Sequence, residues 1–337
     1  MKKPDKDTVF ASHLNDISAF HARMLSDVHR NQGLRQAIES FVSGETRFLD
    51  VGSGTGIWAI LAAKLGARRV VAIEIEECLI PLIYKHAQEN EVADKIEIVH
   101  GNVDDVRLND QFDVIVSELF GRDVYGETTT RSFISLRERF LAPGGVIIPQ
   151  WMKMYAAPLF VQDDPGKNND LPVSTNFLDG LRLNYGRLTT MEDRVGLKLA
   201  AEPKLLTGID YTTIDKPLAV EPLSAAWDIE NLSQIDSFIV FSVSQFAPGI
   251  ELNSLESKTW ILERFGFRPF EQASGTLRFS ITMAPQNPTW TISLPSHQEI
   301  GPQTYSPIFA FTRAKMALQT TPFRSYRSAK SKTSKKK

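Results

Sequence analysis

Residues 48–56 constrain the fold of this chain more than any other stretch, because they read FLDVGSGTG. Apolar, β-prone residues lead into an acid, and glycines follow at 52, 54 and 56. The next residues, IWAILAAKLGA, are apolar with a helical period. Glycine permits φ > 0 and lets the backbone approach a ligand closely. We therefore predict a strand, a tight turn and the start of a helix at a nucleotide-type ligand.

A second strand is predicted over 69–73, directly before Glu74. An acid at the end of the second strand of such a unit can accept hydrogen bonds from ribose hydroxyls. The pattern so far fits NAD, FAD or S-adenosylmethionine. The glycine spacing x-G-x-G-x-G differs from the G-x-G-x-x-G of NAD enzymes, so an NAD oxidoreductase is the weaker alternative.

Alternating apolar segments predict an α/β fold with a doubly wound, Rossmann-like sheet up to residue 149. A helical pattern covers 16–41. The fourth strand is apolar throughout after Asp113, as buried parallel strands are. The further expected elements are strands 48–51, 69–73, 96–100, 112–117 and 146–148, and helices 57–65, 77–90 and 129–141.

After Pro149 the pattern changes to short strands separated by turn residues, which predicts an antiparallel sheet or β-barrel-like domain over 150–320. A mixed helical segment over 175–196 interrupts it. We expect a flexible N-terminus over 1–15 and a disordered, Lys- and Arg-rich tail over 321–337, because the tail has almost no apolar residues. The strands expected here are 152–159, 210–214, 237–244, 258–264, 276–282, 289–294 and 307–312.

Composition excludes several classes of protein. A single cysteine, Cys78, excludes a disulfide framework and a cysteine-based zinc site, and the few scattered histidines argue against any metal site. The net charge of −2 makes nucleic acid an unlikely partner. The N-terminus has no signal-peptide pattern, and no apolar run approaches membrane-spanning length. We expect a cytoplasmic protein that does not insert into a membrane.

Two acids, Glu118 and Glu127, follow the fourth strand, where an open α/β sheet forms its ligand crevice. Gly121 and Gly126 lie between them and allow the loop to fold back. Two carboxylates facing one cavity repel each other unless a cation lies between them. A guanidinium fits, because it is planar and binds carboxylates in a forked, bidentate way. The alternative remains open that Glu118 caps a helix and that Glu127 is a solvated loop acid.

These acids and the glycine stretch, together with HARMLSDVHR, VVAIE and GNVDDV, resemble the protein arginine methyltransferases. These are class I S-adenosylmethionine enzymes with a double-glutamate loop. The resemblance covers about residues 20–150 and continues more loosely to about 294. The family's spacing of nine residues is present from His21 to Arg30 and again from Glu118 to Glu127.

The resemblance implies S-adenosylmethionine as the cofactor and a role for each matching residue. Glu118 and Glu127 match the catalytic pair that holds the substrate guanidinium. The cofactor-binding positions are Arg30 for the methionyl carboxylate, His21 and Met24 over the cofactor, Gly52 and Gly54 beneath it, Glu74 for the ribose, and Val103 and Asp104 for the adenine.

The chain departs from the family pattern on both sides of the expected site. The family's Tyr-Phe-x-x-Tyr motif before the histidine is absent, with Ala11 and Asn15 in its place. Arg122 and Thr129 replace large residues that follow the first glutamate. The resemblance therefore leaves the substrate open among protein arginines, peptides and small guanidino compounds.

The family's Thr-His-Trp loop reads Lys-Thr-Trp here, so Thr259 stands at the histidine position. Asp27 matches the acid that would pair with that histidine. Without the histidine, we expect Glu127 or bulk water to take the proton that the methylated nitrogen loses.

We expect an S-adenosylmethionine-dependent N-methyltransferase acting on the guanidino group of arginine. The alternatives are a methyltransferase on another nucleophile and a non-catalytic member that only binds the cofactor. Residues 163–199 match the family's dimerisation arm, which implies a homodimer. The alternative for this segment is an ordinary surface insertion.

Overall fold

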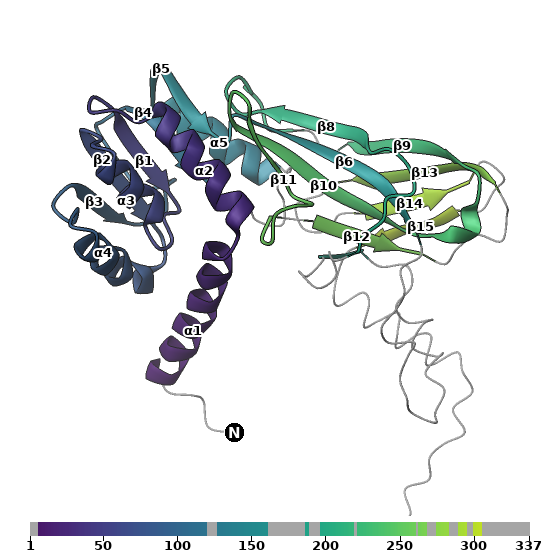
Figure 1. The fold of residues 1–337 in the computed structure, drawn as a ribbon, viewed down its shortest axis with the longest axis horizontal. Helices are drawn as coiled ribbons and strands as arrows, with labels where there is room; N and C mark the ends of the chain where they lie inside the picture. Colours follow the sequence, from purple (N-terminus) through teal and green to yellow (C-terminus); the bar gives the residue numbers. More distant parts are fainter. Residues whose placement is uncertain are drawn as a thin grey trace, which may run out of the picture.

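The computed structural model describes residues 6–119, 127–160, 186–188, 196–218, 221–260, 262–267, 274–282, 289–294 and 299–304. For residues 6–14, 127–128, 186–188 and 299–304 it describes the backbone alone. Figure 1 shows the parallel-sheet domain and its helices at the left, and the antiparallel sheets at the right.

The first domain is built on a parallel sheet with the strand order β3-β2-β1-β4-β5. The order reverses between β1 and β4, and in open α/β sheets ligands bind outside the carboxyl ends of the strands at such a point. Strands β1, β2 and β4 are almost wholly buried, which explains their continuous apolar sequence. The strands are β1 Arg47–Val51, β2 Arg69–Glu74, β3 Ile96–His100, β4 Phe112–Ser117 and β5 Leu141–Ile148.

Helices cover this sheet and lead into it. Helix α3 packs on β1 and β2, α4 lies beside β3, and α5 contacts β5. Helix α2 contacts α3 as well as two antiparallel strands, so it lies between the two parts of the molecule (Figure 1). The helices are α1 Lys6–Leu25, α2 Val28–Phe41, α3 Ile57–Lys64, η1 Glu77–Leu79, α4 Ile80–Glu89 and α5 Glu127–Phe140. Within the described ranges, no helix is both long and apolar enough to cross a membrane.

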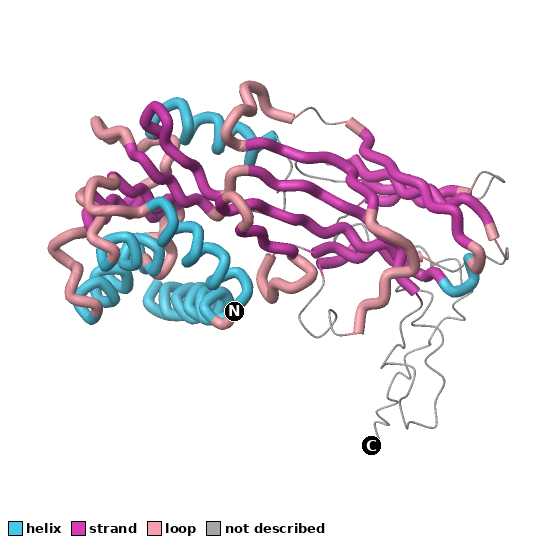
Figure 2. The backbone as a smooth tube through the Cα atoms, turned by 45° about the horizontal axis from the view of Figure 1, so that its top comes forward, coloured by secondary structure: helices cyan, strands magenta, loops and turns pink. Residues whose placement is uncertain are grey.

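The second part consists of antiparallel sheets. One has the order β7-β12-β10-β6-β8 with β11 paired to β10, and the other has the order β15-β14-β13-β9. Figure 2 shows these long strands as a layer that continues from the parallel-sheet domain. The strands are β6 Trp151–Phe160, β7 Gly186–Leu188, β8 Lys204–Asp210, β9 Pro222–Ile229, β10 Ile235–Ala247, β11 Ile250–Asn253, β12 Leu262–Gly266, β13 Gly275–Thr282, β14 Thr289–Ser293 and β15 Glu299–Thr304, with the short helix η2 Leu232–Gln234 before β10.

Aromatic side chains fill the space between the antiparallel sheets. Phe238 of β10 stacks on Phe279 of β13 with ring centroids 4.9 Å apart, and Phe265 of β12 meets Trp290 of β14 at 5.4 Å. Most of the buried apolar residues of both sheets and of the first domain form one continuous cluster, and a smaller separate cluster lies on β6, β10 and β12. The predicted fold class, a Rossmann-like sheet followed by antiparallel strands, is therefore confirmed.

The N-terminal region differs from the prediction. Helix α1 begins at Lys6, inside the stretch 1–15 that we expected to be flexible, because apolar residues at 9, 10, 14 and 17 continue a helical period. The helical pattern over 16–41 is two helices, which are separated by Ser26 and Asp27. Asp27 is the N-cap of α2 and accepts a hydrogen bond from the Arg30 amide, which fixes the new start.

Two predicted antiparallel strands are misplaced, and side-chain capping explains both. The strand expected over 210–214 is β8, which ends at Asp210, because the Asp210 carboxylate accepts the Thr212 amide at 2.8 Å and turns the chain. The strand expected over 258–264 begins at Leu262, because Asp27 binds the amides of Lys258 and Thr259. Strands β7, β9, β11 and β15 were not predicted, and β7 lies within the segment 175–196 that was expected to be helical.

Several predictions fall on residues outside the described ranges. These are the helical segment over 175–196 apart from β7 and Gly196, the strand over 307–312 and the tail over 321–337. Within the proposed arm, 163–199, the described part includes β7, which pairs with β12.

Candidate active site

A cavity of about 190 Å³ opens where the parallel sheet reverses its strand order. The carboxyl ends of β1 and β4, the end of α1 and the antiparallel strands all contribute to its wall. The cavity brings together most of the site residues predicted from the sequence: His21, Met24, Arg30, Gly52, Gly54 and Glu118.

The glycine turn after β1 needs glycine for two reasons. Gly52 and Gly54 have φ of 71° and 57°, in the left-handed region that other residues rarely adopt. A Cβ at Gly54 would lie 2.4 Å from His21 Cε1, and one at Gly52 would lie 2.7 Å from Leu119 Cδ2. Gly54 therefore lies directly against the His21 side chain.

Glu74 ends β2 and is almost fully buried, with 4% of its surface exposed. Its Oε2 accepts the amide of Gly54 at 2.6 Å, and its Oε1 accepts the amide of Glu76 at 2.9 Å. Glu74 thus braces the glycine turn, and each oxygen keeps room for a further hydrogen bond. It does not line the cavity itself.

The predicted adenine-binding pair, Val103 and Asp104, lies after β3 and also outside the cavity wall. The Val103 carbonyl accepts Arg139 Nη1 at 2.9 Å, and the Asp104 amide donates to Asn102 Oδ1 at 3.0 Å. These bonds fix the turn that follows β3.

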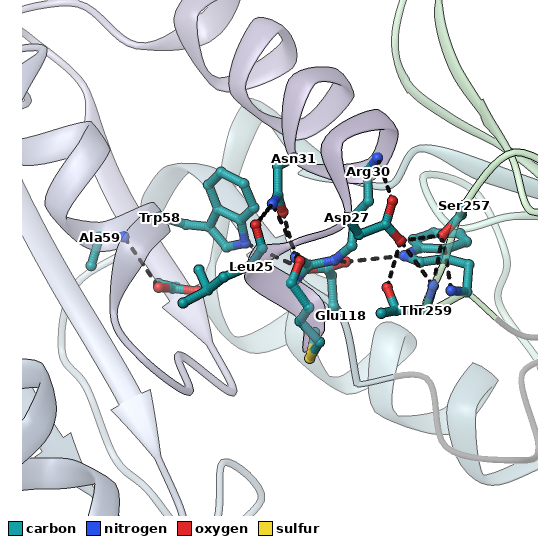
Figure 3. Close-up of polar contacts among 12 residues, drawn as sticks. Leu25, Asp27, Arg30, Asn31, Trp58, Ala59, Glu118, Ser257 and Thr259 are labelled. Carbon is teal, nitrogen blue, oxygen red and sulfur yellow. Dashed lines mark hydrogen bonds and ion pairs between the residues drawn. The ribbon is translucent and has the colours of Figure 1, made fainter. Parts of the chain in front are cut away.

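The centre of the cavity is an ion pair between Arg30 and Glu118, residues that are only 3% and 11% exposed. Arg30 Nε donates to Glu118 Oε1 at 2.8 Å, and Arg30 Nη2 donates to Oε2 (Figure 3). The contact is therefore forked, with two parallel N–H donors on one carboxylate. Arg30 was predicted to bind a cofactor carboxylate and Glu118 a guanidinium, and here each holds the other.

Two tryptophans complete the surroundings of Glu118, and sequence reasoning gave neither of them a role. Trp58 Nε1 donates to Glu118 Oε2 at 3.2 Å, and Trp260 Nε1 donates to Oε1 at 3.3 Å. Trp58 lies in the first turn of α3, and its ring also lies beneath the Arg30 guanidinium, 5.6 Å from the centroid. An indole two residues after the last glycine of the turn was the available signal, since a buried indole N–H needs an acceptor.

Asp27 is completely buried and joins the two parts of the molecule (Figure 3). Its Oδ2 accepts from Ser257 Oγ at 2.6 Å, from Thr259 Oγ1 at 2.7 Å and from the amides of Lys258 and Thr259. Burial alone would raise the Asp27 pKa, but these hydrogen bonds and the one from the Arg30 amide outweigh it and lower the pKa. Thr259 thus contacts Asp27 through an amide and a hydroxyl, neither of which carries a charge.

Asp50, near the end of β1, is a buried acid in the wall of the cavity. Its Oδ2 accepts the Ala59 amide at 3.1 Å and so ties the first turn of α3 to the sheet. Burial, followed by the charges of Glu118 and Glu74, raises the Asp50 pKa to about 7, although hydrogen bonding opposes the shift.

His21 is one of the cavity residues from α1, and its pKa is lowered from the ordinary value. Burial lowers its pKa, the charge of Glu74 opposes that change, and Arg30 adds to it. The Glu127 side chain lies outside the described residues, although its backbone begins α5. No group of three metal-ligating side chains comes together in the described part of the chain.

Comparisons with known proteins agree with this geometry. A family model for ribosomal protein L11 methyltransferase (PrmA) matches residues 32–148. A probable protein arginine N-methyltransferase 6 from Arabidopsis thaliana is 36% identical over 142 residues, which are 41% of this chain and 32% of that protein. Protein arginine N-methyltransferase PRMT10 from Oryza sativa subsp. japonica is 33% identical over 195 residues, 54% of this chain and 50% of that protein. The matches thus span a third to a half of these relatives.

Solved structures extend the likeness across both parts of the chain. A Trypanosoma brucei PRMT1 enzyme–prozyme complex with AdoHcy superposes with a TM-score of 0.69 at 19% identity, covering 85% of this chain and 96% of that one. Arabidopsis thaliana protein arginine methyltransferase 10 gives a TM-score of 0.66 at 21% identity, covering 86% and 99%. At these identities the superpositions show the fold, a methyltransferase sheet followed by an antiparallel domain. In sequence over 41–54% of its length, and in fold over most of its length, the chain is therefore similar to protein arginine N-methyltransferases.

Proposed function

We propose that the protein is an S-adenosylmethionine-dependent N-methyltransferase acting on the guanidino group of arginine. One observation carries this proposal above the others. Glu118, at the carboxyl end of β4, shares a cavity with the glycine turn and already binds a guanidinium, that of Arg30, in forked geometry.

The residues around the cavity fit the proposed cofactor. Glu74, braced against the glycine turn, keeps acceptor room for ribose hydroxyls. Arg30 supplies a buried cation for the methionyl carboxylate, and the His21 and Met24 side chains close the cavity from α1. When bound, S-adenosylmethionine would supply a methyl group whose C–S bond breaks as a guanidino nitrogen forms the new N–C bond, with the sulfur leaving as a neutral thioether.

The ion pair makes Arg30 a residue with two alternative partners. In this structure its fork occupies Glu118. To release Glu118 for a substrate, Arg30 must turn to another carboxylate, and that of the methionyl group has the required charge. Arg30 would then hold the cofactor carboxylate only by leaving Glu118, and this change of partner would free Glu118 for the substrate.

Once released, Glu118 contributes to catalysis by orientation and charge. A carboxylate that holds two guanidinium N–H groups fixes the plane of the substrate and draws positive charge toward the nitrogens it binds. The remaining nitrogen keeps its electron density for the new N–C bond. The proton lost from that nitrogen passes to Glu127 or to water, because Thr259 cannot serve as a base.

The similarity to protein arginine N-methyltransferases favours an arginine of a protein or peptide as the substrate. Incubation with isotope-labelled S-adenosylmethionine, offering an Arg-rich peptide beside free arginine, tests this by mass spectrometry. Label on an arginine of the peptide is the expected result. Label on free arginine alone assigns a small guanidino substrate, and label on neither, despite cofactor binding, contradicts the proposal.

We further propose a cytoplasmic homodimer formed through residues 163–199. The support is the family resemblance of this segment and its apolar residues Phe177, Leu181, Leu183 and Tyr185, which lie outside the described ranges. Light scattering on the full chain and on a variant lacking this segment compares the two assemblies. Equal masses would exclude the segment as the interface.

A further inference from the structure

The number of donors around Glu118 defines what else this carboxylate can bind. A carboxylate has about four lone-pair positions, two on each oxygen. Here Oε1 accepts from Arg30 Nε and Trp260 Nε1, and Oε2 accepts from Arg30 Nη2 and Trp58 Nε1. The two oxygens are thus filled symmetrically, each by one guanidinium N–H and one indole N–H.

The indole of Trp58 is fixed by the start of α3. Its residue is only 7% exposed, and it follows Gly56, the N-cap of the helix. The first turn is tied down by the bond from the Ala59 amide to Asp50, and a Cβ at Gly56 would lie 2.6 Å from Ile83. Trp58 cannot follow Glu118 if that side chain rotates, so its N–H defines a fixed direction.

The indole of Trp260 is fixed separately, by the antiparallel domain. It meets the Phe246 ring edge-on at 5.5 Å, and its backbone amide donates to Ser257 Oγ at 2.9 Å. The two indoles therefore hold the two Glu118 oxygens from two different domains.

We propose that Trp58 is a positioning residue for the substrate guanidinium, acting through Glu118. When Arg30 leaves, the indoles of Trp58 and Trp260 stay, and each oxygen keeps one free acceptor position. Two positions, one per oxygen, match the two parallel N–H groups of a forked guanidinium. A lysine ammonium is a point charge without this fork, so the arrangement favours arginine. This inference rests on the proposed function and adds a specificity residue to it.

A conservative substitution separates the two contacts that Trp58 makes. Trp58→Phe keeps an aromatic face under Arg30 and removes the N–H, whereas Trp58→Leu removes both. The matched control is Trp227→Phe, which removes an indole N–H bonded to the Glu202 carbonyl at 2.9 Å in the antiparallel domain. Melting temperatures of all three variants report whether they fold.

Steady-state kinetics with an arginine peptide give the main test. We expect Trp58→Phe to lower kcat/KM roughly 10- to 100-fold, as loss of a hydrogen bond to a charged group does, through both kcat and the peptide KM. The Kd of S-adenosylhomocysteine should change by less than about threefold, because the face under Arg30 remains. Trp58→Leu should also weaken the cofactor, and Trp227→Phe should change neither constant.

Indole NMR signals give a second test on the unmodified protein. In tryptophan-labelled protein with S-adenosylhomocysteine, an arginine amide should move the Trp58 Nε1–H signal and leave that of Trp227 unchanged, and a lysine amide should move neither. Assignment uses the variants, since the chain has five tryptophans.

The outcomes separate this inference from the proposed function. Suppose that the wild-type protein methylates arginine. The role of Trp58 is then refuted, and the function stands, if the folded Trp58→Phe variant has the same kcat/KM as the wild type or if arginine amide does not move the Trp58 signal. If the wild-type protein binds S-adenosylhomocysteine but methylates no guanidino compound, both fail.

Discussion

The parallel-sheet domain reaches the cavity through the ends of its strands, whereas the antiparallel domain reaches it chiefly through the loop 257–260 and the strand residues Met152 and Ser242. The first domain supplies groups that can change partners, such as Arg30. The loop supplies neutral donors, such as the hydroxyl of Thr259 and the indole of Trp260. The two domains therefore contribute differently: the first supplies a side chain that can change its binding partner, and the second supplies fixed donors to Asp27 and Glu118.

The two acids that both domains contact are the best positions at which to test this difference. Glu118 belongs to the exchanging part and Asp27 to the joint between the domains. Substitutions at these two positions should therefore fail in different ways, one in turnover and the other in stability.

The largest expected effect is on turnover. Glu118→Gln and Glu127→Gln should each lower kcat by about a hundredfold or more, because a neutral amide cannot hold a guanidinium by charge. Asp113→Asn is the matched control, since Asp113 pairs with Arg47 on the far end of the same strand. Near-normal rates in both glutamine variants would point to a methyltransferase on another nucleophile.

A substitution at the joint should cost stability. Asp27→Asn leaves an amide NH₂ group facing N–H and O–H donors and should lower the free energy of unfolding by about 2–3 kcal/mol. Urea titration measures this, with Asp210→Asn as the control, because Asp210 accepts similar bonds from Thr212 at an exposed turn. An equal loss in the two variants would mean that burial of the joint adds nothing.

The two buried aspartates predict opposite pH dependences. The pKa of Asp50 is raised to about 7, so its contribution to stability is present below its ordinary pKa of 3.8 and is lost as the pH rises through 7. Between these two pH values, the ionisation of this one group changes the free energy of unfolding by at most about 1.4 kcal/mol per pH unit. The pKa of Asp27 is lowered, so its contribution is lost only as the pH falls below about 4.

Unfolding titrations at pH 5, 6 and 8 check this difference. Asp50→Asn should flatten the slope in this window, while Asp27→Asn should leave the slope unchanged. A wild-type slope that survives the Asp50→Asn substitution would assign the pH dependence to another group.

The smallest effect concerns the exchange of Arg30. S-adenosylhomocysteine should tighten binding of an arginine amide roughly 5- to 100-fold relative to 5′-methylthioadenosine, a typical range for coupled sites. The second nucleoside has no amino-acid carboxylate and so leaves Arg30 on Glu118. Calorimetry measures both affinities, with a lysine amide as the control ligand. Equal affinities with the two nucleosides would show that Arg30 need not leave Glu118.

The sequence predicted the first domain well because its signals are local. Buried parallel strands read as apolar runs, and the glycine turn needs backbone angles that few residues adopt. Joined to the family resemblance, these signals placed six of the predicted residues, Arg30 and Glu118 among them, on one cavity.

The sequence could not predict the contacts that depend on tertiary distance. Arg30 and Glu118 are 88 positions apart, and Asp27 and Thr259 are 232 positions apart, so neither pattern nor period reveals these bonds. The same capture of loop amides by Asp27 ended a predicted strand early. Trp58 looked like one more apolar residue of a buried helix, because its polar atom matters only beside Glu118.

The Asp27 joint also determines how this chain can be recombined. Its carboxylate is at once the cap of α2 and the acceptor for the loop 257–260. A chimera that took everything after Pro149 from a relative would bury the Asp27 carboxylate against a loop that does not supply the same hydrogen-bond donors. The unit that must be exchanged together is therefore discontinuous in sequence and consists of the junction between α1 and α2 and the loop 257–260. Keeping these two segments from the same parent matters more than the position of the splice point.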